Sequence, residues 1–225
     1  MGWSEWVREV EVEPSLYGAD FAHLGDQVDG LLDADCRIFH FDVGDGHFVE
    51  PVTIGPIVLQ SIAPVVHRFE GAIDVHLMVE HPTTYFAAIK AAGGDSVTFH
   101  YEAVEDVPGT IAAAREHGLQ VGMAFNPETE PEAAAAVAEG LDLVLCMSIH
   151  PGYSGQEFRE DTYQRLERLR RALPDGVYIQ VDGGVTFDNI RPLYDRGARL
   201  FVAGNSIFSF EDLPRAYRRL VHELA

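Results

Sequence analysis

Residues 120–151 read QVGMAFNPETEPEAAAAVAEGLDLVLCMSIHP. Two short apolar runs, QVGMAFNP and LVLCMSIHP, enclose the alanine-rich segment TEPEAAAAVAEG, which has the composition and spacing of a helix. A strand–helix–strand order predicts two parallel strands joined by a crossover helix. Both runs are almost continuously apolar, which is typical of strands that are buried on both faces of a parallel sheet. This stretch therefore predicts a βαβ unit.

The same alternation extends in both directions along the chain. Short apolar runs span 9–16, 36–43, 72–79, 96–103, 120–127, 143–151, 178–185 and 200–208. Segments with helical spacing lie between them, among them 82–94, 107–118, 129–140 and 161–173. Eight strand–helix units in 225 residues match the small end of the size range of (β/α)₈ barrels. Because no linker or change of composition divides the chain, we expect one TIM-barrel domain over residues 1–225.

A doubly wound open sheet is the alternative α/β architecture. Such folds usually carry a G-x-G-x-x-G turn after the first strand, whereas the first run here ends in PSLYGADF. Gly118 and Gly197 stand where a glycine would end a helix, and Pro82 and Pro131 stand where a proline would begin one. The barrel is favoured, with the long segment 45–64 as a candidate active-site loop.

Charge limits the partners of the protein. Its 36 acidic and 16 basic residues give a net charge of −20, which disfavours nucleic acid and anionic membranes. No run approaches the roughly 18 apolar residues of a membrane span, and the first residues lack a secretory signal. Cys36 and Cys146 lie in apolar runs and are expected to be buried thiols. We therefore expect a cytoplasmic protein, in which an anionic substrate needs a local site of backbone N–H groups.

Candidate metal ligands fall at the ends of the expected strands. His40 and Asp42 are two residues apart, so both side chains point to one face of the second strand, and His76 and Asp182 end the third and seventh strands. A single histidine in an apolar strand is more often a hydrogen-bonded core residue, but a buried carboxylate is costly without a partner. Four such groups at one end of a barrel suit one divalent metal ion, namely Zn, Fe(II), Mn or Co.

Glycine-rich segments follow the late strands. These are HPGYSGQ at 150–156, VDGGV at 181–185 and VAGNS at 202–206. Glycine loops after the last strands of a barrel frequently bind phosphate through backbone N–H groups. One such loop is a weak signal, but three on neighbouring strands favour a phosphate site.

Taken together, these motifs resemble the ribulose-phosphate 3-epimerase family. The resemblance runs from residue 14 to residue 208 and rests on FHFDVGDGHFV (39–49), IDVHLMV (73–79), MSIHPGYSGQEF (147–158), QVDGGV (180–185) and VAGNSIF (202–208). It implies that one divalent metal is bound by His40, Asp42, His76 and Asp182. It implies that Asp42 and Asp182 are also the acid/base pair, and that the protein is a homo-oligomer. The substrate-binding residues implied are Ser15, His76, Met78, Met147, Gly152, Ser154, Gly155, Gly183, Gly184, Gly204 and Asn205.

The implied reaction interconverts D-ribulose 5-phosphate and D-xylulose 5-phosphate. Inverting a carbon beside a carbonyl needs one group to remove its proton and another to return a proton from the opposite face, through an enediolate. Carboxylates on opposite strands, two and seven, can address both faces, and a metal can stabilise the developing charge. Methionine sulfur offers a polarizable lining without competing protons.

The chain departs from the family pattern around the substrate. Gly44 replaces a methionine, which is expected to open space that Tyr17 fills in part; His150, Tyr153 and Ser154 alter the phosphate loop, and Asn205 alters the last turn. An epimerase of another ketose phosphate, such as D-allulose 6-phosphate, and a non-catalytic family member are therefore alternatives. A related phosphate-binding decarboxylase is disfavoured because its Asp-x-Lys-x-x-Asp motif is absent and Lys90 is the chain's one lysine.

Overall fold

The computed structural model describes residues 2–153 and 155–225 of the chain. Eight parallel strands form one sheet in the order β1-β8-β7-β6-β5-β4-β3-β2. The strands are β1 (Glu11–Pro14), β2 (Ile38–Gly44), β3 (Ala72–Met78), β4 (Ser96–His100), β5 (Gln120–Phe125), β6 (Leu143–Met147), β7 (Tyr178–Asp182) and β8 (Leu200–Ala203).

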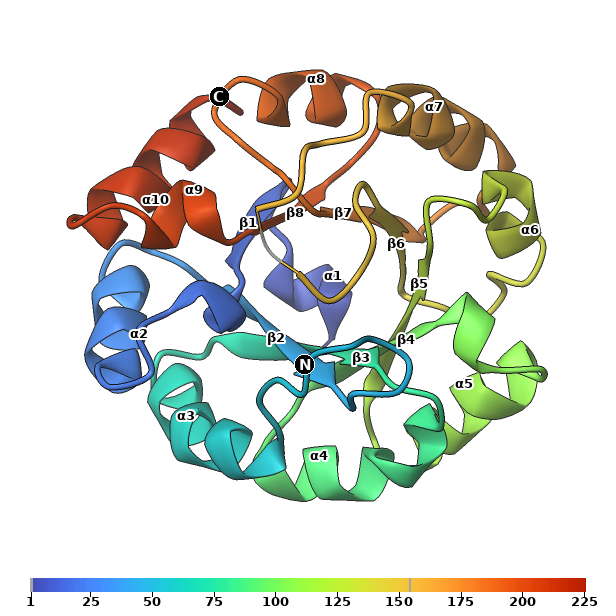
Figure 1. Cartoon of the computed structure of the whole chain (residues 1–225), viewed down its shortest axis with the longest axis horizontal. Coiled ribbons are helices and arrows are strands. Elements are labelled where there is room, and N and C mark those ends of the chain that lie inside the picture. The colour runs from blue at the N-terminus through green and yellow to red at the C-terminus, as the bar shows by residue number, and fades with distance from the viewer. Residues whose placement is uncertain (1, 154) are drawn as a thin grey trace.

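The sheet closes on itself through its first two strands. β1 pairs with β8 over its whole length, and a parallel bridge between Ser15 and His40 joins the end of β1 to β2. The fold is thus a single-domain (β/α)₈ TIM barrel, nearly closed, as the alternation of strands and helices predicts (Figure 1).

Helices surround the barrel in the ring seen in Figure 1. They are α2 (Leu24–Leu32), α3 (Pro56–Arg68), α4 (Phe86–Ala92), α5 (Val107–Glu116), α6 (Pro131–Ala135), α7 (Thr162–Ala172), α8 (Ile190–Asp195), α9 (Asn205–Phe208) and α10 (Leu213–His222). Three 3₁₀ turns, η1 (Leu16–Gly18), η2 (Pro82–Thr84) and η3 (Tyr101–Ala103), follow β1, β3 and β4. None of the helices in the described ranges is long and apolar enough to cross a membrane.

Side chains alternate between the two faces of each strand. The outward set, such as Phe39, Phe41 and Val75, is fully buried in the main apolar core beneath the helices. Polar side chains occupy the intervening positions, for example His40 and Asp42 on β2, and are buried as well. The upper interior of this barrel is therefore polar, and a polar interior must be satisfied by hydrogen bonds, charges or a ligand.

A short helix that the sequence does not signal covers the other end of the barrel. This helix, α1 (Trp3–Trp6), lies across the centre of the ring in Figure 1. Trp3 and Trp6 pack against the first residues of several strands, including Ile38 and Leu143, in a second apolar cluster. The indole of Trp3 donates a hydrogen bond to Ser96 Oγ at 3.3 Å. This helix therefore seals the N-terminal end of the barrel with apolar surface.

Several expected boundaries differ from the observed ones. The segment 45–64 is shorter as a loop than predicted, because α3 begins at Pro56 and continues through Pro64. Proline is well placed at the first helical position, and Pro64 stands on the exposed face, where water can satisfy the carbonyl that loses its partner. The helix expected over 129–140 is only α6, and that over 82–94 divides into η2 and α4.

Other expectations from the sequence hold. Gly118 and Gly197 follow helices with φ of +71° and +103°, the left-handed conformation that suits glycine after a helix. Cys36 and Cys146 are buried free thiols, and burial raises the pKa of Cys146 to about 11.

Candidate functional site

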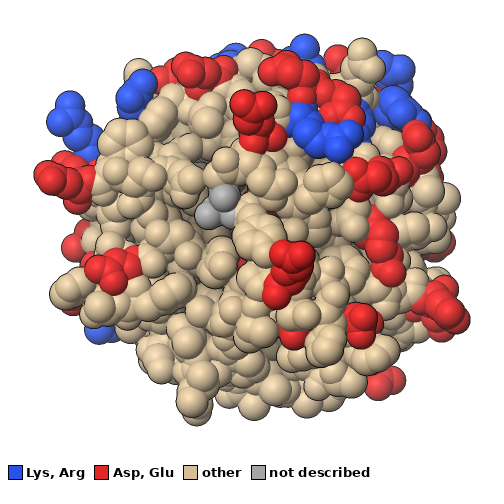
Figure 2. Space-filling model, viewed as in Figure 1, with Lys and Arg blue, Asp and Glu red and all other residues tan. Residues whose placement is uncertain are grey.

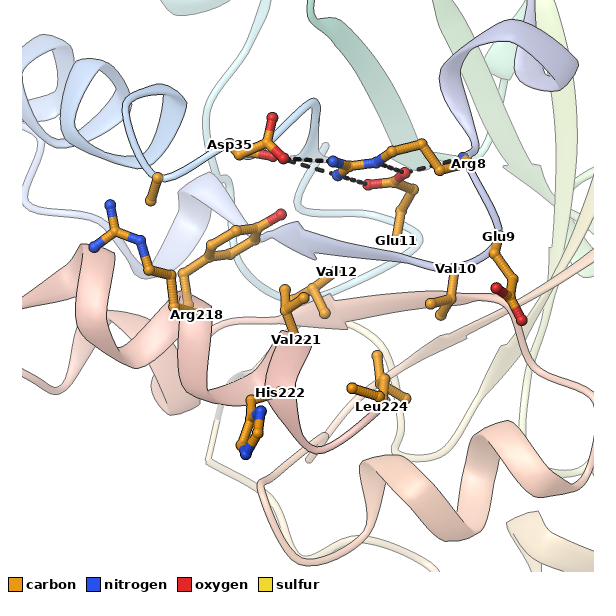
Figure 3. Close-up of a pocket in the computed structure, with 13 residues that line it drawn as sticks. Arg8, Glu9, Val10, Glu11, Val12, Asp35, Arg218, Val221, His222 and Leu224 are labelled. Carbon is orange, nitrogen blue, oxygen red and sulfur yellow. Dashed lines mark hydrogen bonds and ion pairs between the residues drawn. The ribbon is translucent and has the colours of Figure 1, made fainter.

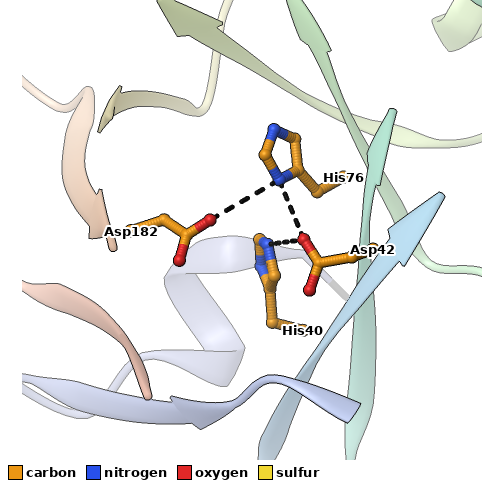
Figure 4. Close-up of side chains that lie close together, drawn as sticks. All are labelled: His40, Asp42, His76 and Asp182. Atoms are coloured by element: carbon orange, nitrogen blue, oxygen red, sulfur yellow. Dashed lines mark hydrogen bonds and ion pairs between the residues drawn. The ribbon is translucent and has the colours of Figure 1, made fainter. Parts of the chain in front are cut away.

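Four charged side chains meet at the C-terminal end of the barrel (Figure 4). They are His40 and Asp42 from β2, His76 from β3 and Asp182 from β7, and one ligand atom of each lies within 4.8 Å of the others. The register of β2 and β3 pairs Asp42 with His76. Asp42 Oδ1 lies 3.1 Å from His76 Nδ1 and 3.3 Å from His40 Nε2, and Asp182 Oδ2 lies 3.8 Å from His76 Nδ1. The four residues singled out from strand ends are thus brought together.

The sequence predicts that β2 and β7, which carry Asp42 and Asp182, lie on opposite sides of the barrel, and the structure corrects this. β2 and β7 are not opposite each other in the ring, because only β1 and β8 lie between them. Asp42 and Asp182 nevertheless reach one cluster, since both stand at the upper ends of their strands. The carboxylates approach the centre from directions set by these two strands rather than from across the barrel.

The surroundings of Asp42 and Asp182 shift the pKa values of these two carboxyl groups in opposite directions. Burial alone would raise the pKa of Asp42, but the charge of His40 beside it and the hydrogen bond from His76 hold it well below its ordinary value. For Asp182, burial and the nearby charge of Asp42 raise the pKa above its ordinary value. Pairs of titratable groups whose pKa values are displaced in opposite directions are typical of acid/base sites.

The donor set and its spacing fit a small divalent cation. Four ligand atoms at about 2.0–2.2 Å from a tetrahedral ion are roughly 3.3–3.6 Å apart, close to the 3.1–3.8 Å separations of this cluster. Within the described residues, neither ring nitrogen of His40 has a hydrogen-bond partner, although the imidazole is fully buried. A buried imidazole without a hydrogen-bond partner is costly, and a cation bound between His40 and the carboxylates of Asp42 and Asp182 would give it a partner.

A serine and two methionines border the cluster. Ser15 follows β1 and its hydroxyl donates a hydrogen bond of 2.7 Å to Asp42 Oδ2, the carboxylate oxygen that faces away from His76. Met78 and Met147 are buried beside Asp42 and Asp182 and line a cavity of about 60 Å³ there. Gly152, Tyr17 and Tyr153 line the same cavity. The sequence-predicted positions therefore surround the carboxylate pair.

A second cavity, of about 210 Å³, opens beside the first. The two share Ser15, Ile149 and Asp182. Glycines and two side-chain amides from the late loops line the second cavity, namely Gly155, Gly183, Gly184, Gly204, Gln156 and Asn205. Ser154, which was expected beside them, lies outside the described residues.

Two of these glycines are required by the backbone. Gly183 and Gly184 have φ of +107° and +62°, and a β-carbon on Gly183 would collide with the side chain of Ile149. Glycine adopts this conformation without strain, and the absence of side chains leaves the backbone of this turn accessible from the cavity.

The loop that follows β2 corrects one expectation. A β-carbon on Gly44 would lie 2.8 Å from the carbonyl oxygen of Pro51 and 3.0 Å from Val49. Thr53 Oγ1 accepts a hydrogen bond from Gly44 N and donates one to the carbonyl oxygen of Asp42, both at 2.7 Å. The absence of a methionine at residue 44 therefore does not open the pocket, because the loop itself fills that space.

The loops after β2 and β6 lie over the centre of the ring in Figure 1 and contact each other. Tyr153 donates a hydrogen bond of 2.5 Å to Glu50 Oε2, and a β-carbon on Gly152 would touch Val49. His150 instead lies 3.4 Å from Glu128, on the exposed side of its loop. Of the altered loop residues, Tyr153 thus borders the cavity and His150 does not.

The structure adds residues to which the sequence assigned no role. His100, at the end of β4, places Nε2 2.8 Å from His76 Nε2, and its Nδ1 lies 3.4 Å from Glu102 Oε2. Burial lowers the pKa of His100 to about 4. His100 ends its strand as Asp182 does, which is the signal that could have assigned it.

A buried polar layer lies below the cluster. His40 Nδ1 is 3.5 Å from Asp74 and 3.8 Å from Glu13, and Gln180 donates to both carboxylates at 3.2 and 2.7 Å. Burial raises the pKa of Glu13 to about 7. Each residue of the layer stands two positions before a residue of the upper site, so the period of the strand could have identified them.

The groove in Figure 3 does not share these features. This cavity of about 470 Å³ lies at the N-terminal end of β1 and is lined by Val10, Val12 and residues of α10. Arg8, one of its charged lining residues, is already paired with Glu11 and Asp35. Active sites of TIM barrels lie at the opposite, C-terminal end, which favours the upper cavities.

Figure 2 shows the charge on the face that is viewed in Figure 1. Acidic side chains are scattered around this face, and basic side chains gather along its upper rim. Because the chain has a net charge of −20, an anion at this face would depend on local donors rather than on the overall field.

The fold and the cluster define a (β/α)₈-barrel enzyme with paired acidic groups beside an anion-sized cavity. A sequence model described as the ribulose-phosphate 3 epimerase family matches residues 11–208. The chain is 37% identical over 222 residues to ribulose-phosphate 3-epimerase from Escherichia coli K12, covering 97% of this chain and 98% of the relative. It is 35% identical to the Bacillus subtilis protein of the same name, covering 92% and 96%. The chain therefore belongs to the ribulose-phosphate 3-epimerase family and is an isomerase of the epimerase type.

Solved structures of other proteins agree on the fold. The α-subunit of tryptophan synthase from Pyrococcus furiosus, in a mutant form, superposes with a TM-score of 0.71 at 18% identity and covers 97% of this chain and 98% of its own. At this identity the similarity concerns the barrel alone.

Proposed function

We propose that the protein is a metal-dependent 3-epimerase that interconverts D-ribulose 5-phosphate and D-xylulose 5-phosphate. The observation that carries this proposal is the pair of carboxylates at one site, Asp42 with a lowered pKa and Asp182 with a raised one. Membership of the family and the names of its relatives support the reaction class.

The cation would be held by His40, Asp42, His76 and Asp182. The divalent ion, when bound, would supply positive charge to stabilise the enediolate oxygens. Zn, Fe(II), Mn and Co are the candidates for a set of two imidazoles and two carboxylates.

The carboxylates would exchange protons at C3 of the sugar. One carboxylate, in its ionised form, accepts the C3 proton, and the C3–H electron pair moves into the enediolate. The other, in its protonated form, returns a proton to C3 from the opposite face, so that the configuration inverts and the pair has exchanged roles. In the metal-free site the lowered pKa of Asp42 favours its ionised form and the raised pKa of Asp182 favours its protonated form, which supports a pair with one of each.

The substrate would extend across both cavities. The glycine-lined cavity would hold the phosphate through backbone N–H groups, and because it shares Ser15 and Asp182 with the smaller cavity, the sugar carbons would lie beside the carboxylates. Met78 and Met147 would line the reacting carbons, with Gly152 and Asn205 at the two ends. His76, which the resemblance also implies as a substrate contact, is fully buried and would act here as a metal ligand. Ser154 belongs to the same proposed loop.

We further propose a cytoplasmic homo-oligomer. The buried free thiols suit a reducing compartment. Exposed apolar side chains of Phe21 and Ile57, which border a groove between α2 and α3, offer surface for assembly. Size-exclusion chromatography with light scattering tests this part, and a monomer at micromolar concentration would contradict it.

The first experiment is solvent exchange at C3, followed by NMR in D₂O after chelation and with metal added back. Ribulose 5-phosphate and allulose 6-phosphate are compared side by side. Metal-dependent deuterium uptake with conversion of the pentose supports the proposal. Uptake with the hexose alone would make the protein an epimerase of that ketose phosphate, and silence with both would indicate a different sugar or a non-catalytic member.

A further inference from the structure

His100 contacts the outer nitrogen of a proposed metal ligand. Its ring is fully buried, and its Nε2 lies 2.8 Å from Nε2 of His76. The ring centroids are 5.0 Å apart and the planes differ by 21°, so the two imidazoles meet edge to edge. Phe48 packs against His100 from the other side, with ring centroids 4.7 Å apart. One nitrogen of this pair must donate and the other must accept, since a single proton fits between them.

The direction of that hydrogen bond is set by Glu102. Its Oε2 lies 3.4 Å from His100 Nδ1, and its Oε1 accepts hydrogen bonds from the backbone N–H of Asn126 at 2.8 Å and from the hydroxyl of Thr129. An ionised carboxylate is acceptor-only, so His100 must carry its proton on Nδ1 to bond with it. The neutral ring of His100 then offers the lone pair of Nε2 to His76.

The hydrogen bond from His76 to His100 decides which nitrogen of His76 faces the carboxylates. His76 must donate from Nε2, so its Nδ1 is the nitrogen that faces Asp42 Oδ1 at 3.1 Å and Asp182 Oδ2 at 3.8 Å. That position suits either a proton, which His76 then donates to Asp42, or a metal ion that takes the place of the proton. The chain of hydrogen bonds from Glu102 thus directs Nδ1 of His76, rather than Nε2, to the proposed metal position.

We propose that His100 and Glu102 are positioning residues that fix the tautomer and orientation of His76, so that its Nδ1 is presented to a divalent cation. Outer hydrogen-bond partners of ligating histidines commonly act in this way. The inference rests on the proposed function, because it takes His76 as a metal ligand. Neither residue lines the two cavities of the site, so both act through His76 rather than on substrate.

The test measures affinity for Co²⁺ by competition with a chromogenic chelator. His100→Leu removes the acceptor and is expected to weaken Co²⁺ binding about ten- to a hundredfold. His100→Gln keeps an amide oxygen near the same place and should retain affinity within about fivefold of wild type. His117→Gln, on the exposed end of α5, is the matched control and should match wild type. Saturating Co²⁺ should restore turnover in each variant, because the substrate contacts are intact.

Glu102→Gln gives a second test if His100→Leu does not fold, with exposed Glu105→Gln as its control. NMR of ¹⁵N-labelled histidine in the metal-free protein reads the tautomer directly. Wild type should show His76 protonated on Nε2, and Glu102→Gln should shift His76 toward the other tautomer and weaken Co²⁺ binding at least threefold. Circular dichroism and thermal melting check that each variant is folded.

The outcomes separate the two proposals. A folded His100→Leu or Glu102→Gln protein that binds Co²⁺ as tightly as wild type would overturn the positioning role alone. A wild-type protein that binds Co²⁺ but epimerises neither sugar would overturn the proposed reaction and leave the positioning role standing. Absence of binding in wild type would overturn both.

Discussion

The hydroxyl of Ser15 donates a hydrogen bond of 2.7 Å to Oδ2 of Asp42, across the seam where β1 meets β2. The other oxygen, Oδ1, faces His40 and His76. Asp42 therefore divides its two oxygens between a hydroxyl and the histidine cluster. This division holds the carboxylate plane in one orientation and links the closure of the barrel to the site.

Ser15→Ala removes the donor to Asp42 and is expected to lower kcat/KM about 10- to 100-fold. A hydrogen bond to a charged group contributes about 1.5–3 kcal/mol, and the variant leaves Oδ2 without this partner. Steady-state kinetics with ribulose 5-phosphate check the change. Ser61→Ala, which removes an exposed hydroxyl on α3, is the control and should be neutral. Equal activity of both variants would show that Ser15 does not orient Asp42.

Asp182→Asn removes one member of the proposed acid/base pair without changing its shape. We expect loss of C3 exchange by at least ~100-fold, the lower range for a missing general acid or base, with the fold retained. Proton NMR in D₂O and circular dichroism measure both quantities. Asp195→Asn, at an exposed pair with Arg191, should behave as wild type. Near-normal exchange in Asp182→Asn would rule out the two-carboxylate mechanism.

Gly44→Ala is expected to destabilise the protein by about 1–3 kcal/mol, because its β-carbon would press on the carbonyl of Pro51. Gly44→Met, which restores the residue usual in the family, should be at least as harmful. Gly25→Ala is the matched control, since a β-carbon there meets nothing within 4 Å and alanine favours the α2 helix. Urea unfolding compares the three variants. A stable, more active Gly44→Met protein would mean that the loop yields to the side chain.

Glu13 should make stability depend on pH. Its pKa is about 7 in the folded protein and near 4.5 in the unfolded chain, so the folded state binds more protons between these values. The free energy of unfolding should therefore decrease as pH rises from about 4.5 to 7, by up to roughly 3 kcal/mol at 1.36 kcal/mol per unit of pKa.

Urea unfolding of the chelated protein at pH 5, 6 and 7 measures this slope. Glu13→Gln should flatten it, whereas Glu116→Gln, an exposed substitution on α5, should leave it unchanged. An identical slope in Glu13→Gln would assign the pH dependence to other groups.

Particular residues show how far prediction from sequence reached. The (β/α)₈ fold followed from apolar runs separated by helical segments, a local property of each run. His40, Asp42, His76 and Asp182 were found because each lies toward the end of an apolar run, and in a parallel barrel the C-terminal ends of all strands lie on one face. Helix α1 was missed because its four residues carry too little periodicity to predict a helix.

Local pattern also indicated where the glycine-lined cavity would lie. The glycines at 183 and 184 have positive φ, a conformation that glycine adopts without strain, so this turn was readable from residue type. The lack of space at Gly44 could not be read from residue type. It depends on Pro51 and Val49, which approach from a loop whose path is set by distant packing.

The sequence by itself determined the order of strands and helices, the residues at the strand ends and the glycine turns, because each depends on neighbours within a few positions along the chain. Only the tertiary structure decided that Glu102 bonds to His100, that His100 bonds to His76, and that the pKa values of Asp42 and Asp182 move in opposite directions. Those properties depend on distances of a few ångströms between different strands and on burial from water. Such distances are set by barrel closure and side-chain packing, on which the spacing of residues along the chain carries no information.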